Sequence, residues 1–85
     1  MQFNFPEILT NRTREQQAQK VVDEVNEYFQ EEDVALSDKE AVDVAHACET
    51  FLRVHFRGRM EVLDKLINAT IKKNTARGYY AKECF

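Results

Sequence analysis

The sequence has few of the residues that form turns and cross-links. Its 85 residues include two glycines, one proline, two cysteines and no tryptophan. A fold of many short strands needs turn residues at its corners, so this composition argues against such a fold and favours helices. The two cysteines, Cys48 and Cys84, are too few for a disulfide framework, and we expect both to be free thiols.

Long hydrophobic runs are also missing. No segment is long enough and apolar enough to cross a bilayer, and the N-terminal residues lack the basic start and apolar core of a secretory signal. We therefore expect a cytoplasmic protein without a membrane partner. A chain of 85 residues buries only part of its unfolded surface, so oligomerisation is expected to complete the core.

The charged side chains are unevenly distributed along the chain. Residues 15–49 carry 11 acidic and two basic side chains, whereas residues 50–85 carry eight basic and three acidic ones. A DNA-binding protein more often shows a basic excess over a whole face, so no nucleic acid polymer is expected as a partner. An acidic stretch followed by a basic one can supply a cation site and an anion clamp.

Hydrophobic residues at helical spacing predict an all-α fold with three helices. Thr13 and Gln16 have the spacing of a capping box, which opens a first helix from about Thr13 to Glu32 after a lead-in of residues 1–12. Gly78 stands just past the end of the third helix, where glycine adopts the left-handed conformation most easily.

The second predicted helix is hydrophobic over more than half of its circumference. Ser37 and Glu40 have the spacing of another capping box and predict where this helix starts. Because its hydrophobic residues are not confined to one stripe, the helix needs cover on more than one side. We expect a three-helix protomer that completes a four-helix type of bundle as a homo-oligomer, either a dimer or a tetramer.

Four acidic side chains are placed to meet between the first two helices. Glu24 and Glu27 are three residues apart on the first helix, and Glu40 and Asp43 are three apart on the second. Four close carboxylates repel one another unless a divalent cation neutralises them. Oxygen ligands without Cys or His favour Mg²⁺, or Mn²⁺, over Zn²⁺. An ordinary solvated acidic surface is the alternative.

These motifs resemble those of the MazG-like all-α nucleoside triphosphate pyrophosphohydrolases. Glu24-Val-Asn-Glu27 and Glu40-Ala-Val-Asp43, with twelve residues between them, are similar to the ExxE and ExxD signature of that family. Residues 71–80 are similar to its C-terminal element, in which Lys-Asn is followed by Arg-Gly-Tyr. The resemblance implies a single MazG-like helical domain over residues 13–85.

The resemblance also implies an activity and a set of site residues. The activity is Mg²⁺-dependent cleavage of a nucleotide between its α and β phosphates, which releases a monophosphate and pyrophosphate. Glu24, Glu27, Glu40 and Asp43 would bind the metal, and Glu24 or Glu27 would orient the attacking water. The implied substrate contacts are Lys20, Lys73, Asn74, Arg77 and Tyr80.

Two other functions fit the same residues. One is a non-catalytic helical interaction module whose acidic face contacts a partner, and the other is a nucleotide-binding relative without turnover. The two histidines, His46 and His55, are too far apart in sequence to share a metal on one helical turn. We expect His46 at the surface and His55 at the edge of the core.

Overall fold

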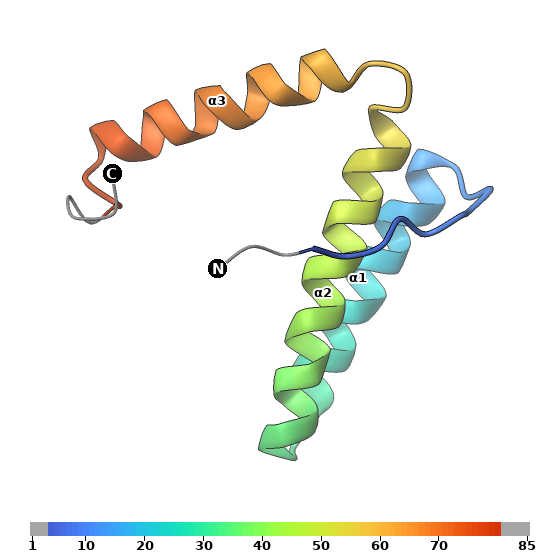
Figure 1. Ribbon diagram of the computed structural model, residues 1–85. Helices are drawn as coiled ribbons and strands as arrows, with labels where there is room; N and C mark the ends of the chain where they lie inside the picture. The colour runs from blue at the N-terminus through green and yellow to red at the C-terminus, as the bar shows by residue number, and fades with distance from the viewer. Residues whose placement is uncertain (1–3, 81–85) are drawn as a thin grey trace. The chain divides into compact units, whose positions relative to one another are not determined.

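The computed structural model describes residues 4–80, and all regular secondary structure in this range is α-helical (Figure 1). The helices are α1 (Arg14–Gln30), α2 (Val34–His55) and α3 (Met60–Ala76). The predicted all-α fold with three helices is confirmed. None of the helices in the described part of the chain has the length and apolar character needed to span a membrane. The chain divides into two compact units, Met1–His55 and Phe56–Phe85.

The start of α1 is the predicted capping box. The backbone N–H of Gln16 donates to the Thr13 hydroxyl at 3.1 Å, and the Thr13 N–H donates to the Gln16 side-chain oxygen at 2.8 Å. Each side chain thus accepts a hydrogen bond from a backbone N–H that has no acceptor within the helix. The helix ends at Gln30, two residues before the predicted end.

The predicted start of α2 is wrong by about one turn. The helix begins at Val34, and the Asp33 carboxylate accepts a hydrogen bond from the Leu36 N–H at 3.1 Å. Ser37 already donates its N–H to the Asp33 carbonyl at 2.8 Å, so it lies inside the helix. Aspartate caps a helix as well as serine does, and Asp33 comes first along the chain. The Glu40 side chain is therefore not part of a helix cap.

In the first unit, α1 and α2 form an antiparallel hairpin with a three-residue connection (Figure 1). Three of the four buried residues among residues 4–55 are polar: Gln17 is 1% exposed, Thr50 2% and Glu24 8%, and the fourth is Ala47 at 7%. Gln17 donates its side-chain N–H to the Ala47 carbonyl at 3.2 Å, which fixes the register of the two helices. The seam of the hairpin is thus polar, where a hydrophobic core would be the common arrangement.

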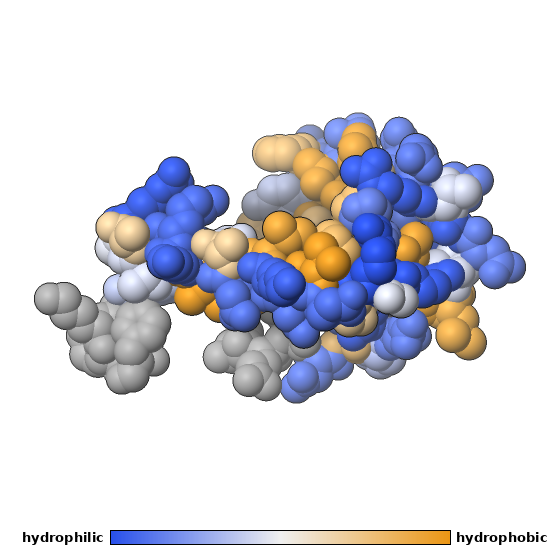
Figure 2. Space-filling view, turned by 90° about the horizontal axis from the view of Figure 1, so that it is seen from above, coloured by the Kyte–Doolittle hydropathy of each residue, from blue (hydrophilic) through white to orange (hydrophobic). Residues whose placement is uncertain are grey.

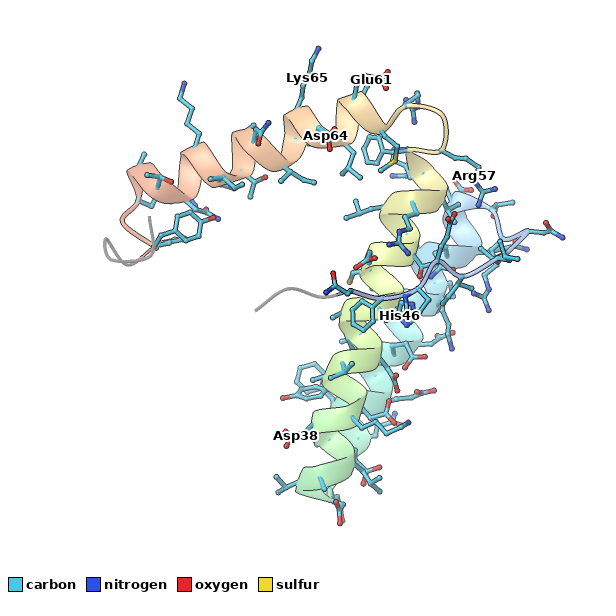
Figure 3. All side chains as sticks on the ribbon, in the orientation of Figure 1. Asp38, His46, Arg57, Glu61, Asp64 and Lys65 are labelled. Atoms are coloured by element: carbon cyan, nitrogen blue, oxygen red, sulfur yellow. The ribbon has the colours of Figure 1, made fainter. Side chains whose placement is uncertain are left out.

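Residues 5–12, here called the N-terminal segment, pack against α2 without forming a helix (Figures 1 and 3). The ring of Phe5 stacks on His46 with 4.4 Å between the ring centroids. A ring nitrogen of His46 lies 3.4 Å from the Pro6 carbonyl oxygen, and Arg53 donates to the Phe5 carbonyl at 3.3 Å. These contacts fasten the N-terminal segment to α2. They also hold His46 half-buried beneath the segment.

The second unit contains α3 and its two glycine turns. Gly58 and Gly78 have φ of +77° and +72°, the left-handed region that favours glycine. After α3, Gly78 donates its N–H to the Thr75 carbonyl and Tyr79 to the Asn74 carbonyl, both at 3.0 Å. This pair of bonds is a Schellman motif, so the predicted role of Gly78 is confirmed.

Many large hydrophobic side chains remain exposed in the described residues (Figure 2). On the hairpin, two shallow apolar hollows of about 280 and 160 Å³ lie along α1 and α2. We call this surface the apolar face, and its hollows are lined by Ala18, Val21, Val25, Tyr28, Ala41, Val44, Cys48, Phe51 and Leu52. A hairpin with a polar seam and an apolar outer surface has its hydrophobic side chains placed to pack against something else.

Candidate functional site

Three of the four predicted metal ligands converge. Glu24 of α1 and Glu40 and Asp43 of α2 each place a carboxylate oxygen within 4.8 Å of the other two, and we call them the acidic triad. Glu40 and Asp43 are three residues apart and share one face of α2. The antiparallel hairpin sets Glu24 opposite that face. The expectation that adjacent helices bring these acids together is confirmed for these three.

Glu27 stands one turn beyond the triad and is exposed. The pKa of its carboxyl is raised above the ordinary value of 4.5, mainly because the charge of Glu24 lies close to it and in part because of the charge of Glu40. A carboxyl with a raised pKa accepts a proton more readily than an ordinary one. Glu27 therefore lies beside the triad and is not one of its members.

Two lysines lie against the triad. The Lys20 ammonium is 2.7 Å from a Glu24 oxygen, and the Lys39 ammonium is 3.6 Å from an Asp43 oxygen. The hydrogen bond between Lys20 and Glu24 lowers the pKa of Glu24 and raises the pKa of Lys20. Burial of the Glu24 carboxyl acts in the opposite direction, but the pKa of Glu24 is still lowered. Each lysine is one turn before its partner on the same helix. The lysines thus offset part of the negative charge.

One buried oxygen of the triad has no hydrogen-bond partner among residues 4–80. Oε2 of Glu40 is buried and makes no hydrogen bond to any of residues 4–80. A buried carboxylate oxygen without a donor is costly, because its desolvation is not compensated. A cation held between Glu40, Glu24 and Asp43 would compensate it.

A cleft of about 200 Å³ adjoins the triad. Its wall comes from all three parts of the first unit, namely the N-terminal segment, α1 and α2. The lining residues are Ile8, Arg12, Gln17, Lys20, Glu24, Asp43, His46 and Ala47. Two of the three acids of the triad therefore share one cleft with the cations Arg12 and Lys20.

Sequence reasoning missed Arg12, Gln17 and His46 as residues of this cleft. A signal for Gln17 was present, because Gln17 precedes Lys20 by three residues and Glu24 by seven, so all three lie on one face of α1. No comparable signal existed for Arg12 and His46. Their position depends on the irregular N-terminal segment, whose path hydrophobic periodicity does not predict.

The other predicted substrate residues belong to the second unit. Asn74 is half-buried, and its side-chain N–H donates to the Tyr80 hydroxyl at 3.4 Å. Lys73 and Arg77 are exposed in the last turn and at the C-cap of α3. The structure thus groups Asn74 with Tyr80 at the end of α3, and Lys20 with the acidic triad on the hairpin.

Comparison of the chain with protein-family models, with curated proteins and with solved structures finds no match.

Proposed function

We propose that this chain is a Mg²⁺-dependent nucleoside triphosphate pyrophosphohydrolase of the MazG-like type. The observation that carries the proposal is the convergence of Glu24, Glu40 and Asp43 around a buried oxygen of Glu40 that lacks a partner. The resemblance of the acidic motifs and of residues 71–80 to that family supports the same function. The absence of any carboxylate partner for Arg12 among residues 4–80 leaves a cation available for an anionic substrate.

The donor set suits Mg²⁺, with Mn²⁺ as an alternative. Oxygen ligands at 2.0–2.1 Å from one octahedral ion lie about 3–4 Å apart, so a separation of up to 4.8 Å needs only small side-chain adjustments. One Glu24 oxygen already forms an ion pair with a cation, the Lys20 ammonium. At such a site Mg²⁺ would neutralise phosphate charge and make water more acidic.

The residues of the chain supply the remaining chemistry. Glu27 would accept a proton from the water that attacks the α phosphorus, because it lies one turn from Glu24 beside the triad and is not one of its three members. The new P–O bond forms as the bond from phosphorus to the bridging oxygen breaks, so pyrophosphate leaves with that oxygen. Lys20 binds phosphate oxygens from the α1 side of the cleft.

The resemblance assigns further substrate contacts to the C-terminal element, which belongs to the second unit. Lys73 and Arg77 supply positive charge for the phosphates, and Asn74 and Tyr80 bind the nucleoside. The apolar face of the hairpin packs against a second copy of the chain, because the exposed hydrophobic side chains there need cover. The active form is therefore a homo-oligomer.

A panel of nucleotides tests the proposal. The purified chain is incubated with each common ribonucleotide and deoxyribonucleotide triphosphate and Mg²⁺, and released pyrophosphate is assayed. We expect release from at least one nucleotide, with loss of release when Mg²⁺ is chelated. Thermal stabilisation by nucleotide without release would indicate a binding protein. Neither release nor any effect of Mg²⁺ and nucleotide on stability would favour a helical interaction module.

A further inference from the structure

Arg12 is the cation of the cleft that has no acidic partner among residues 4–80. The side chain reaches the cleft from the N-terminal segment, next to Lys20 and the triad. Lys20 is paired with Glu24 at 2.7 Å, whereas no carboxylate of residues 4–80 forms an ion pair with Arg12. Arg12 is exposed to solvent, and it lines a cleft that also contains carboxylates without forming an ion pair to them.

The orientation of Arg12 is fixed by a buried residue. Arg12 donates one N–H to the Gln17 side-chain oxygen at 3.1 Å, and the other end of the Gln17 amide donates to the Ala47 carbonyl at 3.2 Å. Gln17 is 1% exposed, so the amide that holds Arg12 is itself held rigidly between α1 and α2. An arginine has five N–H donors, and one bond to Gln17 leaves a fork of donors free for a phosphate.

The N-terminal segment that carries Arg12 is fastened to α2. Phe5 stacks on His46, and Arg53 donates to the Phe5 carbonyl. The segment therefore forms a wall of the cleft, to which it also contributes Ile8. The contacts that hold the segment on α2 therefore also hold the cationic side chain of Arg12 at the cleft.

The size of the cleft limits what part of a ligand it takes. Its volume of about 200 Å³ is below the roughly 300–1,000 Å³ of sites that hold a whole drug-sized ligand. A chain of phosphate groups is compact, anionic and able to bridge a guanidinium to metal-binding carboxylates. The cleft fits such a chain better than a nucleoside.

From these observations we infer that Arg12 binds the polyphosphate chain of the substrate, with Gln17 as the residue that positions it. The inference rests on the proposed function for the identity of the ligand. It adds the N-terminal segment to the substrate site, in which the sequence motifs place only residues of the helices and of the C-terminal element.

Binding of inorganic tripolyphosphate in the presence of Mg²⁺, measured by calorimetry, tests this inference. We compare Arg12→Ala with Arg14→Ala, which removes the same charge two residues away, where Arg14 lies over the Phe51 ring and beside Glu15. Loss of a charge-assisted, forked contact is expected to weaken binding by about 10-fold to 100-fold in Arg12→Ala only. Arg12→Lys keeps the charge without the fork and should recover part of the affinity.

Three further readouts separate binding from folding and from turnover. Mg²⁺ affinity should be the same in Arg12→Ala and Arg14→Ala, and both variants should be fully folded at the assay temperature, although each loses a side-chain contact that can lower its Tm. KM for a hydrolysed nucleotide should rise only in Arg12→Ala. Equal tripolyphosphate affinity in both variants, or no binding to the unaltered chain, would overturn the role of Arg12. Failure of the unaltered chain to release pyrophosphate, with tripolyphosphate binding intact and sensitive to Arg12, would contradict the enzymatic proposal alone.

Discussion

Replacement of Glu40 by glutamine tests the acidic triad most directly. The change keeps the shape of the side chain and removes one negative charge from a group whose oxygens lie within 4.8 Å of one another. It also places an amide where a buried carboxylate oxygen has no partner. Two opposite effects are expected, namely a more stable protein without metal and a protein that Mg²⁺ no longer stabilises.

The size of the first effect follows from Coulomb's law. Two unit charges 4.8 Å apart repel by about 0.9 kcal/mol in water and by about 3.5 kcal/mol at an effective dielectric constant of about 20. The lower value applies better here, because solvent lies close to both sides of a hairpin two helices thick and Lys20 and Lys39 offset part of the charge. Removal of two repulsive pairs, with Glu24 and with Asp43, should stabilise the metal-free protein by about 1–2 kcal/mol.

Thermal unfolding followed by circular dichroism, at one protein concentration, gives both effects. For a domain of this size, 1 kcal/mol corresponds to about 4–8 °C in Tm, so metal-free Glu40→Gln should melt about 5–10 °C higher. Mg²⁺ at about ten times its Kd should stabilise the unaltered chain by about 1.4 kcal/mol and the variant by much less. Asp38→Asn removes an exposed charge from the same helix and serves as the control. If Glu40→Gln responds to Mg²⁺ as Asp38→Asn does, the triad is not the metal site.

Four more predictions concern Glu27, Gly78 and the apolar face. Glu27→Gln should lower kcat by about 100-fold or more while the Mg²⁺-dependent rise in Tm remains, as steady-state kinetics and melting can show. Because the pKa of Glu27 is raised in the folded protein, its contribution to metal-free stability is complete below the ordinary pKa of 4.5 and is lost as the pH rises through the raised pKa. The free energy of unfolding, measured with urea, should therefore fall over this pH range. This part of the fall should be missing in Glu27→Gln. Gly78→Ala should cost about 1 kcal/mol by the same melting assay, because φ of +72° strains any residue with a Cβ although the space around it is open; an unchanged Tm would contradict the role of the Schellman motif. Sedimentation should show no stable monomer at micromolar concentration, and a well-folded monomer there would refute the packing of the apolar face against a second copy.

Local rules predicted most of the helical fold. The capping box of Thr13 and Gln16 and the left-handed Gly78 depend on residues within one turn, and both are present as expected. The predicted start of α2 was wrong because two residues that can cap a helix, Asp33 and Ser37, stand one turn apart. The spacing of a capping box favoured Ser37, since Glu40 follows it by three residues. A capping box is thus decisive only where no earlier residue can cap the helix.

The acidic site was predictable because it depends on two simple periodicities. Pairs of acids three residues apart on each helix, and a short connection, are enough to bring Glu24, Glu40 and Asp43 together. The cation side of the cleft was not predictable in this way. Arg12 reaches it through tertiary contacts of an irregular segment, such as the stack of Phe5 on His46, which no sequence period encodes.

The polar seam of the hairpin links the proposed chemistry to the stability of the fold. Gln17, Glu24 and Thr50 occupy three of the four buried positions of the hairpin, where hydrophobic side chains would stabilise two isolated helices better. Gln17 and Thr50 are satisfied by hydrogen bonds to main-chain carbonyls, but the triad around Glu24 is only partly neutralised. In the function proposed above, two additions would stabilise the hairpin, namely a cation at its seam and a second copy on its apolar face. Mg²⁺ and a second copy of the chain would both bind the folded hairpin. Where folding of the hairpin is incomplete, binding of either one raises the folded fraction and so favours binding of the other. Mg²⁺ should therefore shift the monomer–oligomer equilibrium toward the oligomer. An association constant that is unchanged by Mg²⁺ in sedimentation would show that the seam and the face are energetically independent.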